Sequence, residues 1–127
     1  MNGLPEYGKQ VGLAHLLAAV RYSAGGFSRA CKEAAFRQEI AAGGGLCLFY
    51  SYWGVDATVG FAAAILFLLL IAVEALNTAV EEIVDRISPE ISDTGRHAKD
   101  LGSFAVFCLV TANILLPAYV VAASIWL

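Results

Sequence analysis

Charged residues are scarce in this chain of 127 residues. Asp, Glu, Lys and Arg make up 15% of it, whereas soluble domains contain about 25%. Hydrophobic residues reach 59%, and the mean hydropathy is +0.70. This composition excludes a disordered chain and an ordinary soluble domain. It favours one integral-membrane domain over residues 1–127.

The chain also lacks a basic surplus, a cysteine framework and a secretory signal. Lys and Arg number 8 against 11 Asp and Glu, for a net charge of −3, so we expect no nucleic-acid partner. The cysteines, Cys31, Cys47 and Cys108, lie far apart without the spacing of a metal site. We expect them to be buried apolar thiols. The first residues contain no apolar core followed by a cleavage site.

Three apolar runs each predict a membrane-spanning helix. The first, at about 40–55, ends in Tyr and Trp residues that are typical of the membrane interface. The second covers about 57–87 and is apolar as far as Glu74. The third, 101–127, contains no charged residue. These lengths suit a hydrocarbon core of about 30 Å.

Basic residues set the expected orientation. They precede the first run and lie between the second and third, with none in the other turn or at the C-terminus. The positive-inside rule then places the N-terminus and loop 88–99 in the cytoplasm. Residues 1–39 predict a cytoplasmic surface region, in which Gly25-Gly26 interrupts the apolar stretch and an amphipathic helix follows. The expected fold is all-α, with this amphipathic surface helix and three transmembrane helices.

One face of the second run carries polar side chains. At about 3.6 residues per turn, Glu74, Asn77, Thr78, Glu81 and Asp85 share a helix face. Glu74 follows a long apolar stretch, so it lies at or inside the lipid boundary. A carboxylate there is costly and normally has a function. Such a face can bind a hard cation, act as a general base or relay protons, and the pattern leaves these alternatives open.

Each carboxylate also has a simpler explanation. Glu74 can be a polar contact between helices or a snorkelling residue at the membrane boundary. Glu81 and Asp85 can belong to a solvated helix end. Glu82 has Arg86 one turn further on, which predicts a surface ion pair.

Two further positions carry charge near the expected membrane edge. Glu33 lies between Arg29 and Arg37 at helical spacing, so it is either a surface ion pair or a functional carboxylate. Lys99 precedes Asp100 and the third run, where it can snorkel or meet a phosphate. Three helices cannot easily surround such a site, so we expect an oligomer.

Three segments together resemble a known family. They are 33–39, with the sequence EAAFRQE, 73–86, with VEALNTAVEEIVDR, and 98–106, with AKDLGSFAV. Their order and spacing are similar to those of the prokaryotic diacylglycerol kinases, which are small integral-membrane lipid kinases. The resemblance runs from about Tyr22 to the C-terminus.

The resemblance implies a homotrimer in the bacterial cytoplasmic (inner) membrane, with multi-pass subunits and active sites shared between neighbours. It implies transfer of the γ-phosphoryl group of Mg-ATP to diacylglycerol, giving phosphatidic acid at the cytoplasmic interface. Two alternatives stay open. One is undecaprenol kinase activity, found in a related branch of the family, and the other is a non-enzymatic membrane subunit.

The resemblance also implies roles for individual residues. Glu74 corresponds to the general base, and Asn77 supports the phosphate end. Glu33 and Glu81 correspond to the ligands of Mg²⁺. The implied ATP contacts are Tyr22, Glu33, Glu81, Glu90, Ile91, Ser92, Lys99 and Asp100. The implied lipid contacts are Phe36, Gln38, Glu39, Glu74 and Ser103.

Overall fold

A computed structural model describes residues 12–126 and shows four helices, with no strand in that range. The helices are α1 (Leu13–Ala30), α2 (Ala34–Trp53), α3 (Ala57–Ile87) and α4 (Asp93–Trp126). The all-α prediction is therefore confirmed. Residues 1–11 of the expected surface region and Leu127 of the third run lie outside the described residues.

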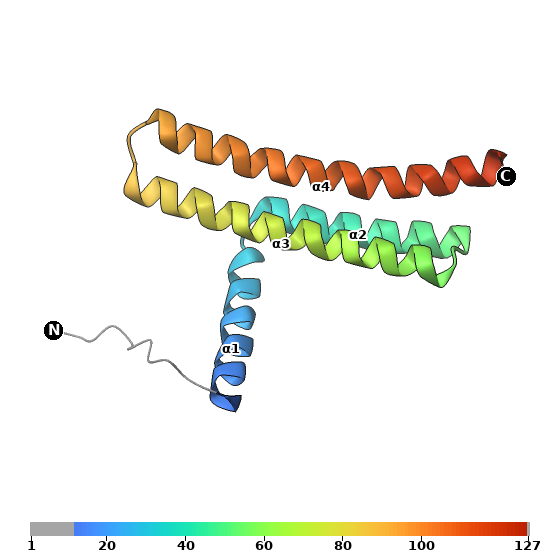
Figure 1. Cartoon of the computed structure of the whole chain (residues 1–127), viewed down its shortest axis with the longest axis horizontal. Helices are drawn as coiled ribbons and strands as arrows, with labels where there is room; N and C mark the ends of the chain where they lie inside the picture. Colours follow the sequence, from blue (N-terminus) through green and yellow to red (C-terminus); the bar gives the residue numbers. More distant parts are fainter. Residues whose placement is uncertain (1–11, 127) are drawn as a thin grey trace.

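The helices form an elongated bundle with one helix set across it (Figure 1). α3 and α4 form a long hairpin, and α2 lies beside the N-terminal part of α3. α1 projects sideways from the point where α2 begins. Gly54 makes the turn from α2 to α3 possible because its φ of 58° suits glycine. Asp56 then caps α3 by accepting a hydrogen bond of 2.9 Å from the Val59 amide.

The helix bounds confirm the second apolar run and modify the other two. α3 covers 57–87 as expected, whereas α4 begins at Asp93, before the expected 101. The loop is correspondingly short and occupies 88–92. Two helices, α3 and α4, are long and apolar enough to cross a membrane, with mean hydropathies of 2.6 and 2.2 over 18 residues. α2 is not one of them, so the count of three spans stays a prediction.

The corner between α1 and α2 differs from the expectation. α1 continues through Gly25 and Gly26, so the predicted interruption there is wrong. The chain turns at 31–33 instead. Arg37 stabilises this corner by donating hydrogen bonds to the carbonyls of Cys31 and Lys32, at 3.1 and 2.7 Å. These contacts satisfy groups that the end of α1 leaves without helical partners.

Two aromatic rings pack against each other at the same corner. Phe27 of α1 and Phe36 of α2 meet edge to face, with ring centroids 6.0 Å apart. Phe36 is only 3% exposed. The ring of Phe36 therefore supports the junction that places α1 across the bundle.

The isolated chain has very little core. Among the described residues, only Ala30, Phe36 and Leu70 are buried hydrophobic residues. In the most apolar 18-residue windows of α3 and α4, just 11% and 6% of residues are buried. Cys47 and Cys108 are exposed too, so the prediction of buried thiols is wrong for them within one chain. The apolar helix faces therefore need lipid or other subunits as their surroundings.

Polar and small residues bring α3 and the neighbouring helices together. The Asn113 side chain of α4 donates to the Leu66 carbonyl of α3 at 3.1 Å. Gly43 of α2 faces the ring of Phe67, which a β-carbon at this position would overlap. The sequence GGG at 43–45 thus includes one close helix contact.

We expect Asn113→Ala to weaken the contact between α3 and α4. The substitution removes the bond to the Leu66 carbonyl and a second bond, of 2.8 Å, to the Leu109 carbonyl in its own helix. A loss of about 1 kcal/mol is expected for an interhelical hydrogen bond in a membrane protein. Unfolding by SDS in mixed micelles, followed by circular dichroism, measures it.

The matched control is Thr111→Ala, because Thr111 bonds only to the Phe107 carbonyl within α4 among the contacts of the described residues. Equal unfolding curves for the two variants would contradict a stabilising role for the Asn113–Leu66 bond.

Candidate active site

Carboxylates from α2 and α3 gather near the point where α1 meets the bundle. Glu74 of α3 is 6% exposed. Glu81 and Glu33 both interact electrostatically with Glu74, and so does Glu39 of α2. A group of like charges around a buried carboxylate costs free energy unless a cation or protons balance it. The structure therefore places the expected base, Glu74, within electrostatic range of both expected metal ligands.

Asn77 lies within this acidic group and holds one of its members. Its side-chain amide donates to Glu81 Oε1 at 3.2 Å. Its Oδ1 is buried without a hydrogen-bond partner among the described residues. The same oxygen faces Gly102 of α4, where a β-carbon would overlap it. Glycine at 102 thus allows α4 to approach Asn77 and bury it.

Glu33 occupies the corner between α1 and α2. It is the N-cap residue of α2, yet its side chain makes no capping hydrogen bond. Glu33 Oε1 instead accepts a bond of 2.6 Å from Arg29 Nη1. This contact confirms the expected ion pair with Arg29, whereas Arg37 bonds to backbone carbonyls.

Arg29 also reaches α3. Its Nη2 donates to Glu82, so the predicted pair between Glu82 and Arg86 is not the contact formed. Arg29 and Glu82 are 53 residues apart, and no local spacing indicates their pairing. The hydrogen bonds that Arg29 donates to Glu33 and Glu82 raise the pKa of its guanidinium above the ordinary value. The group therefore stays charged at any physiological pH.

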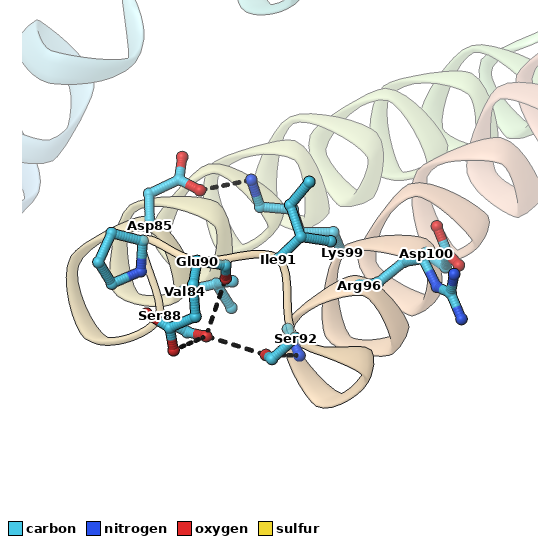
Figure 2. A pocket seen from close by; sticks show the side chains of 11 residues that line it. Val84, Asp85, Ser88, Glu90, Ile91, Ser92, Arg96, Lys99 and Asp100 are labelled. Carbon is cyan, nitrogen blue, oxygen red and sulfur yellow. Dashed lines mark hydrogen bonds and ion pairs between the residues drawn. The ribbon is translucent and has the colours of Figure 1, made fainter.

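A second group of polar residues surrounds the loop between α3 and α4 (Figure 2). They line a cavity of about 270 Å³. Lys99 Nζ reaches across the cavity to Asp85 Oδ1 at 2.5 Å. Five residues expected to contact ATP line this cavity together: Glu90, Ile91, Ser92, Lys99 and Asp100.

Two hydroxyl groups give the loop its shape. Ser88 Oγ bonds to Ser92 Oγ at 2.9 Å and to the Glu90 side chain at 3.1 Å. Ser92 Oγ in turn accepts a bond of 3.0 Å from the Gly95 amide, in the first turn of α4. Serine is well suited to this position because its oxygen replaces a missing helical acceptor. Ser88 and Arg96 line the cavity but were not predicted, since neither lies in a recognisable local pattern.

The expected lipid contacts are divided between different surroundings. Gln38 and Glu39 line an apolar cavity of about 580 Å³ between α2, α3 and α4. Glu39 Oε2 is buried without a hydrogen-bond partner among the described residues. Phe36 packs in the corner, and Ser103 is exposed on α4. Tyr22, an expected ATP contact, lies on α1 and lines neither cavity.

The donor set fits a magnesium ion carried by a nucleotide. In the described part of the chain, no three His, Cys, Asp or Glu side chains are placed to hold a metal. Mg²⁺ commonly takes only one or two protein carboxylates and fills its other positions with phosphate oxygens and water. Glu33 and Glu81 supply two such carboxylates, and both interact electrostatically with Glu74. A magnesium ion bound by these residues would therefore depend on the nucleotide for further ligands.

Comparison with known proteins identifies the family. The family model for prokaryotic diacylglycerol kinase matches residues 21–121. A diacylglycerol kinase of Sinorhizobium is 54% identical over 113 residues, which cover 89% of this chain and 82% of the relative. Diacylglycerol kinases of Pseudomonas aeruginosa and Escherichia coli K12 are 39% and 34% identical over 105 residues each, covering 80% and 82% of this chain and 84% and 86% of the relatives. The chain therefore belongs to the prokaryotic diacylglycerol kinase family.

Proposed function

We propose that this protein transfers the γ-phosphoryl group of ATP to the hydroxyl of diacylglycerol, giving phosphatidic acid and ADP. The observation that carries the proposal is a buried carboxylate, Glu74, set among further carboxylates at the end of the apolar part of α3. The names of the relatives support diacylglycerol as the acceptor. The positive-inside rule supports a site at the cytoplasmic face of the membrane, and the family resemblance supports the inner membrane.

Lys99 and the loop at 88–92 are proposed to receive the nucleotide. Lys99 is paired with Asp85 and offers a cation at the cavity. Phosphoryl transfer depends mainly on positioning and on balancing negative charge. Lys99 would exchange its contact with Asp85 for a phosphate oxygen, and Asp100 would add a contact from the same helix.

Glu33 and Glu81 are proposed to hold Mg²⁺ against the ATP phosphates. The ion supplies charge neutralisation for the phosphates when it is bound. Asn77 keeps Glu81 in place through the hydrogen bond that its side-chain amide donates to the Glu81 carboxylate. Glu33 and Glu81 come from different elements, so the two carboxylates can approach the ion from two sides.

Glu74 is proposed as the general base. Its carboxylate accepts the proton of the lipid hydroxyl as the oxygen forms a bond to the γ-phosphorus and the bond to the ADP oxygen breaks. Glu74 and Glu81 are seven residues apart, or about 10.5 Å along the helix at about 1.5 Å per residue. The base therefore lies nearer the membrane than the metal ligand. The apolar cavity lined by Gln38 and Glu39 is a proposed place for the lipid.

We propose three membrane spans and, as the family resemblance implies, a homotrimer. α2 has 20 residues, so it is about 30 Å long and matches the hydrocarbon core of a bilayer. It lies beside the apolar half of α3. The exposed apolar faces of α3 and α4 leave room for contacts between copies. A neighbouring copy would also close the exposed side of the acidic group.

Phosphate transfer from labelled ATP tests the proposed reaction. We expect Mg²⁺-dependent labelling of diacylglycerol in mixed micelles, with undecaprenol assayed beside it. Labelling of undecaprenol alone would support the proposed kinase activity but would show that the lipid acceptor is undecaprenol instead of diacylglycerol. Labelling of neither lipid, in a preparation that keeps its helical circular dichroism, would contradict the proposal and favour a non-enzymatic membrane subunit.

Glu74→Gln tests the base. We expect kcat to fall about 10²- to 10⁴-fold, because the amide cannot accept the proton. The shape is nearly unchanged, so the elution volume in detergent should stay the same. Asp93→Asn is the matched control, since it makes the same carboxylate-to-amide change at a side chain that is 85% exposed. Activity near that of the control would rule out Glu74 as the base.

Native mass spectrometry in detergent tests the oligomer. The expected mass is that of three copies of the chain, because a trimer covers the exposed helix faces symmetrically. A monomer that retains full kinase activity would contradict a site shared between copies.

A further inference from the structure

The corner between α1 and α2 is held rigidly enough to orient a side chain. The Lys32 amide donates to the Arg29 carbonyl at 3.1 Å, and the Glu33 amide donates to the Ala30 carbonyl at 2.9 Å. Arg37 fixes two further carbonyls of the same turn. The backbones of Arg29 and Glu33 are thus held in a fixed relation to each other.

Arg29 uses this corner to link three elements. From the last turn of α1, its two terminal nitrogens bond separately to Glu33 at the start of α2 and to Glu82 of α3. The planar guanidinium suits such a two-sided contact, since its donors point in fixed directions. Glu82 directly follows Glu81 in the chain. Arg29 therefore ties the Glu33 carboxylate to the turn of α3 that carries the second proposed metal ligand.

The arrangement leaves one carboxylate oxygen of Glu33 available to bind a ligand. The carboxylate does not cap α2, and Arg29 engages only Oε1 among the contacts of the described residues. The side chains of Arg29, Glu33 and Glu82 are 44%, 37% and 52% exposed. Exposed ion pairs contribute little to stability. The value of this contact is therefore more in the orientation that it imposes than in the stability of the fold.

We propose that Arg29 is a positioning residue, aligned by Glu82, that orients Glu33 so that its second oxygen faces a divalent cation held with Glu81. The inference rests on the proposed function, in which Glu33 and Glu81 bind that cation. Hydrogen bonds to a ligating carboxylate fix its direction, and losing one typically weakens metal binding by about 10- to 100-fold. Glu82 balances the charge of Arg29, so the arginine orients the ligand without adding net positive charge.

The direction in which the affinity for the cation changes when Arg29 is replaced distinguishes a positioning role from a purely electrostatic one. Removing a positive charge beside a metal ligand should strengthen cation binding if charge alone matters. Removing an orienting contact should weaken binding. Arg29→Gln therefore gives opposite results under the two explanations.

The experiment measures Mn²⁺ binding by electron paramagnetic resonance, with the full chain in detergent and saturated with the β,γ-imido analogue of ATP. We expect Arg29→Gln to raise the Kd for Mn²⁺ about tenfold or more. Arg29→Lys keeps the positive charge but not the forked donors of the guanidinium, so it should give a smaller increase in the Kd for Mn²⁺. Arg21→Gln is the matched control, because it removes the same charge from an exposed position on α1. An unchanged or lower Kd in Arg29→Gln would overturn the proposal.

Two further variants separate this proposal from the proposed function. Glu33→Gln should weaken Mn²⁺ binding; an unchanged Kd would reject Glu33 as a ligand, and the positioning role with it. A higher Kd for Mn²⁺ in Glu33→Gln, together with an unchanged Kd in Arg29→Gln, would reject the positioning role alone. Glu82→Gln should raise the Kd in the native background and much less in the Arg29→Gln background. Equal effects in both would show that Glu82 acts independently of Arg29, which also overturns the proposal.

Discussion

The buried carboxylate of Glu74 constrains the molecule more than any other group. It lies on one continuous helix whose first part is apolar and whose last part is polar, so α3 must end its contact with lipid at about this residue. Water and lipid cannot both surround such a side chain at low cost, and protein must cover it. α2 carries Glu39, which interacts electrostatically with Glu74, while the approach of α4 at Gly102 buries the neighbouring Asn77.

Much of the architecture could be predicted from the sequence because periodicity and apolar length are local properties. The bounds of α3 agree with the expected 57–87, and the polar face that starts at Glu74 lies on one helix. The start of α4 was placed too late, since residues 93–100 are polar and read as loop, although Ser92 provides a capping oxygen for the first turn. Gly25 and Gly26 were expected to interrupt α1, but two glycines lower helix stability without ending a helix when the contacts at its end hold it.

The grouping of the candidate site residues could be predicted from the sequence better than their contacts. Lys99 and the residues at 90–92 do line one cavity, and Glu33, Glu74 and Glu81 do interact. The pair of Glu33 with Arg29 was expected, but the second contact of Arg29 was not: Glu82 pairs with Arg29 across the fold instead of with Arg86 in its own helix. Helical spacing ranks only neighbours on one helix. A contact between elements depends on where the chain turns, and that turn at 31–33 is set by Arg37 and by the two phenylalanines.

The fold also explains how one short chain can serve a water-soluble donor and a lipid acceptor. The loop cavity with Lys99 lies at the end of the hairpin formed by α3 and α4, whereas α1 joins the bundle away from that end, where Arg29 bonds to Glu82. If α1 rests on the membrane surface, the end of the hairpin extends from that level into water, and Glu74, eight residues before Glu82 in α3, lies on the lipid side of it. A single helix, α3, then sets the relative depth of its own charged groups, with the proposed base Glu74 toward the lipid and Asp85 toward the proposed nucleotide site. The depth of these groups does not fix their lateral positions, and the corner at Glu33 restricts the lateral position of the Glu33 carboxylate.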